Sequence, residues 1–238
     1  MSRVLVIGDI HEPACHPGYM HFCRDLERKY RTDTTVFIGD IADRHSISFN
    51  IYNDELDLYV CPADPRCPGP DEEYELTLAL VKKWYQAFPD AWVTIGDHDA
   101  RNQRLAEAVN GPRDYSDMWH TPKWVWAHDC AIDGVYYFHG DDKRGLNPAY
   151  NSARDLMLSV VMGHCHSASG VKWSASRDKR IFGLDTGCGV DIKALSMAYG
   201  KHFLRKPILS AAVVIDGIPH HEIMPCGPQE RYEACNYE

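Results

Sequence analysis

The sequence predicts an α/β fold with a partly parallel sheet, and three observations support this. Short apolar runs over residues 3–7 and 34–38 are typical of buried strands, and the segment between them carries apolar residues at helical spacing. A strand, a helix and a second strand at this separation form a βαβ unit, whose strands run parallel. Both strands, and a third expected over 91–95, are followed by Gly-Asp.

Two helices are expected in the first half of the chain. Pro17 is suited to the first turn of one, and its apolar residues recur at helical spacing: Tyr19, Phe22, Leu26 and Tyr30. The other is expected over 71–88, where acidic residues come first, an apolar stripe follows and Pro89 ends the pattern. These helices would cover the sheet formed by the three strands.

The second half of the chain is expected to be rich in strands. Runs over 124–127 and 135–138 flank the turn signal Asp133-Gly134, which predicts a hairpin. Three further strands are expected over 158–162, 181–184 and 211–215.

The domain organisation is expected to be simple. The 238 residues contain no internal repeat and no linker, which favours one domain over residues 1–225. Residues 44–70 show no regular pattern and are expected to form an irregular insertion or loop. The polar residues 226–238 are expected to form a C-terminal tail.

Composition and charge exclude several classes of protein. With 45% hydrophobic and 25% charged residues, the chain has the balance of a globular protein and not of a disordered one. The net charge of −9 disfavours stable binding to duplex DNA, which relies on a basic face. No apolar stretch is long enough for a membrane span or a signal peptide, so we expect an intracellular, cytoplasmic protein without membrane contact.

The nine cysteines do not predict a disulfide framework, because their number is odd and they are widely spaced. No CxxC pair is present, which disfavours a zinc ribbon. Cys61 and Cys67 close a short loop that would suit a disulfide or a metal ion, but reduced thiols are the favoured interpretation.

Five predicted strand ends carry Asp or His side chains. Residues that follow the carboxyl ends of parallel strands gather at one edge of the sheet, where ligands bind. Taken singly, each is better explained as a turn residue, a helix cap or a core histidine. Together they predict a site for divalent transition metals, since carboxylates and imidazoles would converge there. The residues are Asp9, His11, Asp40, Asp43, Asp97, His98, His139, His164 and His166.

These motifs closely resemble the calcineurin-like metallophosphoesterase superfamily. Its pattern is Asp-x-His, Gly-Asp-x-x-Asp-Arg, Gly-Asn-His-Asp/Glu, a lone His and Gly-His-x-His. The matching segments here are residues 9–11, 39–44, 96–99, 139–140 and 163–166. A weaker similarity follows at residues 184–188, to a strand and turn found in bacterial phosphatase and diadenosine-tetraphosphatase branches.

The resemblance implies a four-layer αββα sandwich, in which helices flank two mostly mixed sheets and the site holds two divalent metal ions. We expect manganese, with iron, zinc, nickel or magnesium as alternatives. The first ion would be held by Asp9, His11 and His166, and the second by Asp97, His139 and His164, with Asp40 bridging the two.

The resemblance also implies roles for residues that hold no metal. His98 would protonate the leaving oxygen, oriented by Asp43. Arg44 and Arg101 are candidates to bind phosphate oxygens, although Arg101 is equally consistent with a solvated helix residue. No Walker loop and no Gly-x-Ser-x-Gly nucleophile motif is present, so water activated by the metal ions is the expected nucleophile.

Asp97 departs from the family pattern, which has Asn at this position. Three ligand carboxylates against two divalent ions leave a net charge of +1, whereas two carboxylates and an amide would leave +2. The additional negative charge is expected to tighten metal binding and to weaken the Lewis acidity of the ion.

The sequence therefore predicts a metal-dependent phosphoesterase acting on a phosphorylated small molecule, a nucleotide or a short single-stranded nucleic acid. A phosphodiester or nucleotide-type substrate is favoured, with a phosphoprotein or a dinucleoside polyphosphate as the alternatives. Four aromatic residues near His98 would suit base stacking, although packing explains such a cluster more often: Tyr115, Trp119, Trp124 and Trp126. The other function class is a binding scaffold of the same fold that has lost catalysis.

Overall fold

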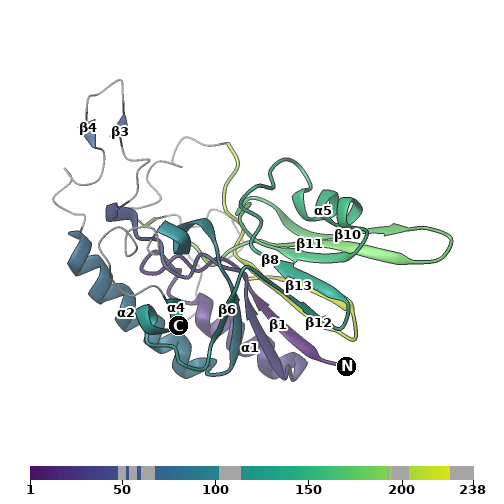
Figure 1. Ribbon diagram of the computed structural model, residues 1–238, viewed down its shortest axis with the longest axis horizontal. Helices are drawn as coiled ribbons and strands as arrows, with labels where there is room; N and C mark the ends of the chain where they lie inside the picture. The colour runs from purple at the N-terminus through teal and green to yellow at the C-terminus, as the bar shows by residue number, and fades with distance from the viewer. Residues whose placement is uncertain are drawn as a thin grey trace.

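The computed structural model contains two β-sheets packed face to face, with helices on both outer sides (Figure 1). It describes residues 1–47, 52–53, 58–59, 68–101, 114–191, 193–194 and 204–225. Cys61, Cys67 and the tail 226–238 lie outside the described residues, as does most of the insertion expected over 44–70. Among the helices that are described, none is sufficiently long and apolar to cross a bilayer.

The first sheet has six strands in the order β13-β12-β1-β2-β5-β6. Its strands β1, β2, β5 and β6 run parallel to one another. Strand β12 pairs antiparallel with β1, and β13 pairs antiparallel with β12. The bounds are Arg3–Ile7 for β1, Thr34–Phe37 for β2, Ala91–Thr94 for β5, Val125–Ala127 for β6, Ser210–Ile215 for β12 and Ile218–Ile223 for β13.

The second sheet has five strands in the order β10-β11-β9-β8-β7. Its central strands β8, β9 and β11 are parallel, and β7 and β10 pair with them antiparallel at the two edges. The bounds are Asp129–Ile132 for β7, Val135–Phe138 for β8, Ser159–Met162 for β9, Ser169–Ala175 for β10 and Arg180–Thr186 for β11. A short ladder of β3 (Tyr52–Asn53) and β4 (Leu58–Tyr59) stands apart.

The helices and the sheets form four layers with an apolar core between each pair. Alternate residues of β1 face opposite ways: Leu5 and Ile7 pack toward the helices, and Val4 and Val6 toward the second sheet. Such a strand is buried on both faces, which explains why its sequence is an uninterrupted apolar run. The helix α5 (Pro148–Leu156) covers the far side of the second sheet. The αββα sandwich expected from the sequence is thus confirmed.

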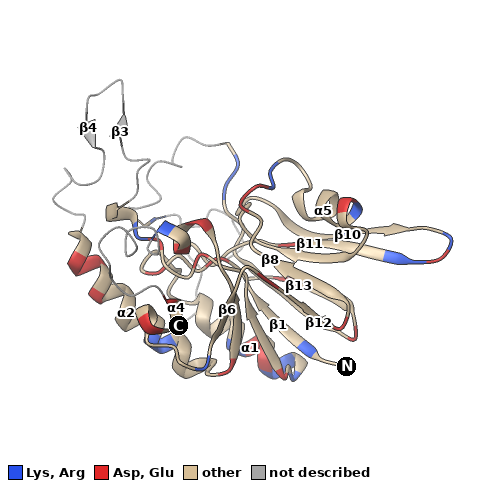
Figure 2. Ribbon diagram, viewed as in Figure 1, with Lys and Arg blue, Asp and Glu red and all other residues tan. Residues whose placement is uncertain are grey.

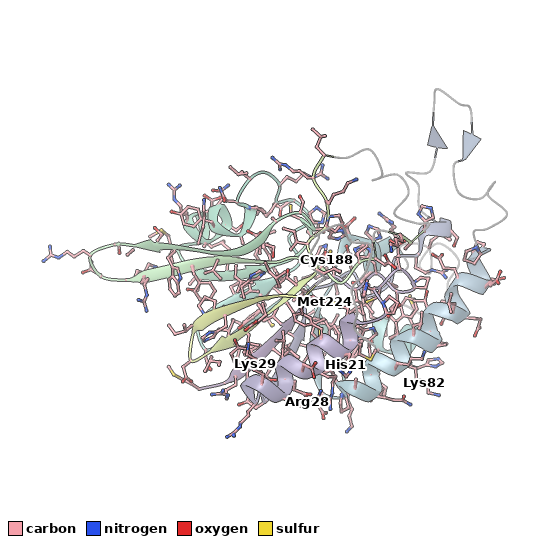
Figure 3. All side chains as sticks on the ribbon, turned by 180° about the vertical axis from the view of Figure 1, so that it is seen from behind. His21, Arg28, Lys29, Lys82, Cys188 and Met224 are labelled. Carbon is pink, nitrogen blue, oxygen red and sulfur yellow. The ribbon has the colours of Figure 1, made fainter. Side chains whose placement is uncertain are left out.

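The helices α1 (Tyr19–Tyr30) and α2 (Pro70–Ala87) cover the outer face of the first sheet. Phe22 and Leu26 of α1 are buried, whereas His21, Arg28 and Lys29 point away from the sheet (Figure 3). Three acidic residues lie in the first turn of α2, where Figure 2 shows red segments. Their negative charges interact favourably with the positive end of the helix dipole and stabilise the helix. Both helices lie where their amphipathic patterns predicted. The described residues also include the 3₁₀ turn η1 (His45–Ile47), a helical turn over residues 97–101 and the short α4 (Tyr115–Trp119).

The predicted hairpin was wrong in one of its strands. Asp133 and Gly134 do form the turn, with positive φ angles of 50° and 79°. However, the strand before the turn is β7, and residues 125–127 instead form β6, which pairs parallel with β5 in the first sheet. The run over 124–127 is a strand, as expected, but its partner is set by the tertiary structure and not by the nearest turn.

Asp185 stands at the end of β11 and caps α5, since its Oδ1 accepts a hydrogen bond of 3.2 Å from the Ala149 amide. Burial raises the pKa of Asp185 to about 6, although the Ala149 hydrogen bond opposes the shift. A raised carboxyl pKa makes a contribution to folding stability that is present at low pH and is lost as the pH rises through about 6.

We therefore expect Asp185→Asn to raise the melting temperature at pH 8 and to leave it nearly unchanged at pH 4. The amide retains an acceptor for Ala149 and removes the cost of a buried charge, a gain of about 1–3 kcal/mol at pH 8. Thermal unfolding of both proteins at the two pH values measures the effect. An equal change at both pH values would show that the carboxylate charge is not the cause.

Candidate metal centre

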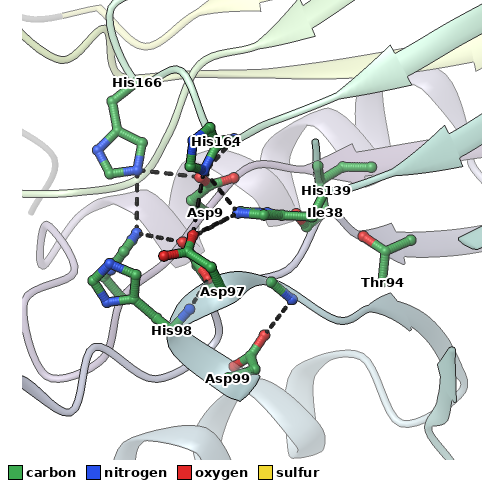
Figure 4. Close-up of polar contacts among 12 residues, drawn as sticks. Asp9, Ile38, Thr94, Asp97, His98, Asp99, His139, His164 and His166 are labelled. Carbon is green, nitrogen blue, oxygen red and sulfur yellow. Dashed lines mark hydrogen bonds and ion pairs between the residues drawn. The ribbon is translucent and has the colours of Figure 1, made fainter. Parts of the chain in front are cut away.

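The carboxyl ends of five parallel strands bring their polar side chains to one place, between the two sheets. Asp9, Asp40 and Asp97 follow β1, β2 and β5 of the first sheet. His139 and His164 follow β8 and β9 of the second sheet. Figure 4 shows the resulting cluster. The sequence prediction that these strand ends converge is confirmed by their positions in the structure.

A first group of ligand atoms comes from Asp9, His11, Asp40 and His166, and these atoms lie within 4.8 Å of one another. The Nε2 atoms of His11 and His166 are 3.1 Å apart. His166 Nε2 is also 3.1 Å from Asp9 Oδ2. These are the four residues expected to surround one of the two ions.

A second group consists of Asp97, His139 and His164, again within 4.8 Å. Asp97 Oδ1 lies 3.4 Å from His139 Nε2 and 3.3 Å from His164 Nδ1. His139 donates a hydrogen bond of 2.7 Å from Nδ1 to the carbonyl of Ile38, which leaves Nε2 for the site. A backbone contact of this kind fixes the ring of a metal-binding histidine.

Asp40 connects the two groups through a single oxygen. Its Oδ2 is 3.3 Å from His11 Nε2, in the first group, and 3.3 Å from His139 Nε2, in the second. Its other oxygen, Oδ1, accepts a hydrogen bond of 2.9 Å from the His98 amide. The carboxylate is therefore held in the position that a bridging ligand requires.

The backbone at the site adopts conformations that most residues avoid. His11, Asp40 and His164 have positive φ angles of 48°, 47° and 62°. Such left-handed positions cost energy for residues with a Cβ and concentrate at functional sites. With the backbone in this conformation, the side chains of all three residues point into the cluster.

Two glycines are required because ligand carboxylates approach their backbones closely. A Cβ on Gly96 would lie 2.1 Å from Asp40 Oδ1, and one on Gly163 would lie 2.1 Å from Asp9 Oδ1. Any side chain at either position would displace a ligand. This close approach explains the glycines of the Gly-Asp-His and Gly-His-x-His motifs.

The charges of the site favour a bound cation. Burial lowers the pKa of His11, but Asp40 and Asp43 outweigh it and raise the pKa to about 10. For Asp97 burial acts to raise the pKa, yet His139 and His164 hold it well below the usual range. The raised pKa of His11 favours an imidazolium that offsets the carboxylates beside it. A divalent cation takes over that role when it displaces the protons.

Two unpartnered oxygens also fit a metal ion. Asp9 Oδ1 and Asp97 Oδ1 are buried, and neither has a hydrogen-bond partner among the described residues. A buried polar atom left in this way is costly unless a ligand satisfies it. Together with the imidazole and carboxylate donor set, these oxygens show that the cluster suits divalent metal ions.

His98 lies at the edge of the cluster and is held by Asp43. Its Nδ1 is 3.0 Å from Asp43 Oδ1, and the same oxygen is 3.0 Å from His11 Nδ1. Asp43 is buried, and although burial acts to raise its pKa, His11 and His98 hold it well below the usual range. One ionised carboxylate thus orients both the metal-facing His11 and His98, as expected from the sequence for His98 alone.

Asp99 is a site residue to which sequence reasoning assigned no role. It is fully buried, and its carboxylate accepts hydrogen bonds from the amides of Gly96, Ile41 and Ala42 at 3.1, 3.0 and 3.4 Å. It therefore ties the loop after β2 to the loop after β5, which carry Asp40 and Asp97. Its place in the third motif was the available signal, but only the structure shows which amides it binds.

The two candidate phosphate-binding arginines lie in different surroundings. Arg44 is nearly buried, donates to the carbonyl of Pro70 at 2.9 Å and lies over the ring of Tyr74. Arg101 lies beside the cluster. Its Nη1 is 3.1 Å from His98 Nδ1, and its Nη2 is 3.1 Å from His98 Nε2. A phosphate-binding role stays a prediction for both, and the geometry favours Arg101.

The aromatic residues considered for base stacking are buried instead. Trp119 is 0% exposed, Trp124 3% and Tyr115 6%. Tyr115 stacks on Trp126, and Trp124 packs on Phe37 of the sheet. Trp119 and Trp124 belong to the core beside the first sheet, and Trp126 packs against it partly buried, which agrees with packing, the explanation that the sequence favoured.

Comparison with known proteins places the chain in a family. A model of the family described as calcineurin-like phosphoesterase matches residues 2–188, which include the whole cluster. The search among curated proteins found no match.

Several solved structures are similar at low identity. Vps29 from Entamoeba histolytica, complexed with Zn²⁺, is 15% identical, with 92% of this chain and 97% of that chain covered and a TM-score of 0.39. Vps29 from Chaetomium thermophilum is 12% identical, with coverages of 90% and 80% and a TM-score of 0.43. YfcE, a phosphoesterase from E. coli, is 13% identical, with coverages of 90% and 88% and a TM-score of 0.40.

The family match agrees with the motifs and with the two mixed sheets flanked by helices. It covers most of the chain, and every motif quoted for the resemblance lies within it. The chain therefore belongs to the calcineurin-like phosphoesterase family.

Proposed function

We propose that this protein is a metal-dependent phosphoesterase that hydrolyses a phosphate ester with His98 as the general acid. The observation that carries the proposal is the arrangement around Asp40. Two groups of ligand atoms share its carboxylate, and His98 lies next to them with its ring held by Asp43. Family membership supports the same chemistry at the level of the superfamily.

The ligand residues suit two divalent ions. Asp9, His11 and His166 would hold one and Asp97, His139 and His164 the other, with Asp40 shared. Bound ions would supply Lewis-acid chemistry, polarising the phosphoryl group and lowering the pKa of water. Manganese is the proposed metal, with iron, zinc, nickel or magnesium as the alternatives, since carboxylates suit manganese and magnesium whereas imidazoles suit iron, zinc and nickel.

His98 is placed to transfer a proton. When Nδ1 donates to Asp43, the second ring nitrogen, Nε2, is the atom that can carry a proton to a leaving oxygen. The side chain is 17% exposed, so a substrate can reach it. Arg101 Nη2 lies 3.1 Å from this Nε2 and can donate to it only while Nε2 is unprotonated. When His98 carries the proton, Arg101 would release the ring and is proposed to donate to a phosphate oxygen instead.

The proposed substrate is a phosphodiester or nucleotide-type molecule, including short single-stranded nucleic acid, and stable binding to duplex DNA is not expected. The net charge of −9 supports the second part of this proposal. A phosphoprotein or a dinucleoside polyphosphate is the alternative. Because the aromatic cluster near α4 is buried, recognition of a base would have to use other side chains.

The proposed function is tested by hydrolysis of two model substrates. Purified protein loaded with Mn²⁺ is assayed with bis-p-nitrophenyl phosphate, a diester, and with p-nitrophenyl phosphate, a monoester. We expect hydrolysis that EDTA abolishes and added Mn²⁺ restores, with a higher rate on the diester. A higher rate on the monoester would contradict the proposed preference for diesters.

The same assay separates the enzyme from a binding scaffold. A protein that carries two Mn²⁺ ions by metal analysis and hydrolyses neither compound, nor any of a panel of nucleotides and oligonucleotides, would contradict catalysis. Hydrolysis that continues after complete removal of metal would contradict the metal-dependent chemistry.

A further inference from the structure

Asp97 brings to the site a negative charge that the more common Asn would not. With Asp9 and Asp40 it makes three carboxylates among the proposed ligands. Oxygen atoms of Asp97 and Asp40 belong to one group of possible ligand atoms within 4.8 Å of one another, so the two negative charges repel each other. A positive charge close to these carboxylates reduces their mutual repulsion.

Arg101 supplies a positive charge next to Asp97. Residues 97–101 form a helical turn that begins at Asp97, so Arg101 lies four positions later on the same face. Its Nη2 is 3.7 Å from Asp97 Oδ2. An acid that precedes a base by four residues in a helix has the favourable orientation for an ion pair.

The two contacts of Arg101 hold the guanidinium in place. One is the ion pair with Asp97, and the other is with His98 Nε2, which lies 3.1 Å from Arg101 Nη2 and can accept a hydrogen bond from it while Nδ1 donates to Asp43. The Arg101 side chain is only 12% exposed, so solvent screens its charge less than that of a surface arginine.

The charges sum to the value expected for the common ligand set. Three carboxylates, two divalent ions and one guanidinium give +2. Two carboxylates, one neutral amide and two divalent ions also give +2. Without Arg101, this site would have a net charge of only +1 and would attract a phosphate anion less strongly.

We propose that Arg101 is a positioning and charge-compensating residue, which offsets Asp97 so that the site keeps the net charge of an Asn-containing centre. The inference rests on the proposed function only in that Asp97 and its neighbours bind metal ions. In this proposal the positive charge of Arg101 and the negative charge of Asp97 cancel, so the net charge of the site depends on both residues together.

The test is Mn²⁺ binding, measured by titration calorimetry on EDTA-treated protein without substrate. Removing the positive charge with Arg101→Gln should tighten binding of the weaker ion roughly tenfold. Asp97→Asn should weaken it by at least a similar factor, since it removes a carboxylate and leaves Arg101 uncompensated. The double variant Asp97→Asn with Arg101→Gln should bind Mn²⁺ more tightly than Asp97→Asn alone.

Binding of inorganic phosphate to the Mn²⁺-loaded proteins should change in the opposite direction. Arg101→Gln should weaken phosphate binding roughly tenfold or more, because the net charge of the site falls and a proposed phosphate donor is lost, so the tightening of Mn²⁺ binding is the measurement specific to charge compensation. Arg101→Lys keeps the charge and should return Mn²⁺ affinity to about the wild-type value. A general loss of structure would weaken both ligands, whereas the proposed role moves their affinities in opposite directions.

Arg28→Gln is the matched control. Arg28 also pairs with an aspartate on a helix, Asp25, but it is exposed on α1 and lies outside the ligand groups. Its substitution should leave Mn²⁺ affinity unchanged. An equal tightening in Arg28→Gln and Arg101→Gln would overturn the proposal, because the effect would then follow from total charge.

The remaining outcomes separate this inference from the proposed function. If the wild-type protein binds two Mn²⁺ ions but Arg101→Gln binds them no more tightly, the charge compensation is wrong and the proposed function stands. If the wild-type protein binds no Mn²⁺, both are wrong.

Discussion

His98→Ala is expected to reduce kcat by about 10²–10⁴-fold while the protein keeps its metal ions. This range is the usual contribution of a positioned general acid. His98 also lies within reach of Asp40 and Asp97, but the groups Asp9, His11, Asp40, His166 and Asp97, His139, His164 are formed without it, and the proposal assigns the ions to these. Steady-state kinetics on the diester and metal analysis of the same preparation measure the two effects together.

The leaving group provides a second measurement for His98. A good leaving group such as p-nitrophenolate needs little protonation, so the loss in His98→Ala should be smaller than with an unactivated alkyl phosphodiester. His128→Ala, at an exposed histidine outside the ligand groups, serves as the control and should retain wild-type kinetics. If His98→Ala loses its metal ions instead, His98 is a ligand and the proposed role is incorrect.

Asp40→Ala is expected to abolish binding of both metal ions and to lower kcat/KM by at least about 10³-fold, since Lewis-acid stabilisation by the ions is worth several kcal/mol. The reason is that Asp40 Oδ2 faces both His11 and His139 at 3.3 Å, so its loss affects both groups of ligands. Metal content after gel filtration and titration with Mn²⁺ measure the stoichiometry directly.

Asp9→Ala is the informative comparison for Asp40→Ala. Asp9 belongs to only one group of ligand atoms, so this variant should keep one ion where Asp40→Ala keeps none. Circular dichroism of both metal-free variants checks that each is folded. Retention of one ion by Asp40→Ala would contradict a shared carboxylate and would assign Asp40 to a single ion.

The sequence by itself determined the chemical identity of the site. The apolar runs that form β1 and β2 are buried on both sides, and this makes them readable as strands without any tertiary information. Gly-Asp or Gly-His after a strand indicates a turn at the edge of the sheet, where the Asp or His side chain can contact a ligand. The Asp and His residues at the strand ends and the amphipathic helices α1 and α2 were therefore predictable, whereas the four-layer class followed from the resemblance of the motifs to a known family.

The sequence was less informative where the signal was local but the partner was distant. Residues 125–127 and 129–132 are both strand-like and adjacent, yet they belong to different sheets. Which sheet each strand joins depends on the neighbouring strand with which it pairs, and no short-range sequence pattern identifies that neighbour. Likewise, Trp119 and Trp124 are aromatic whether they stack on a substrate or fill the core, and only their burial decides.

Only the tertiary structure decided how the ligands combine. The sequence places Asp40 after β2, but its position between His11 and His139 follows from the packing of two sheets that belong to separate parts of the chain. Asp43 contacts both His11 and His98 for the same reason. Side-chain type is a local property, and the distance between two side chains depends on how the whole chain folds.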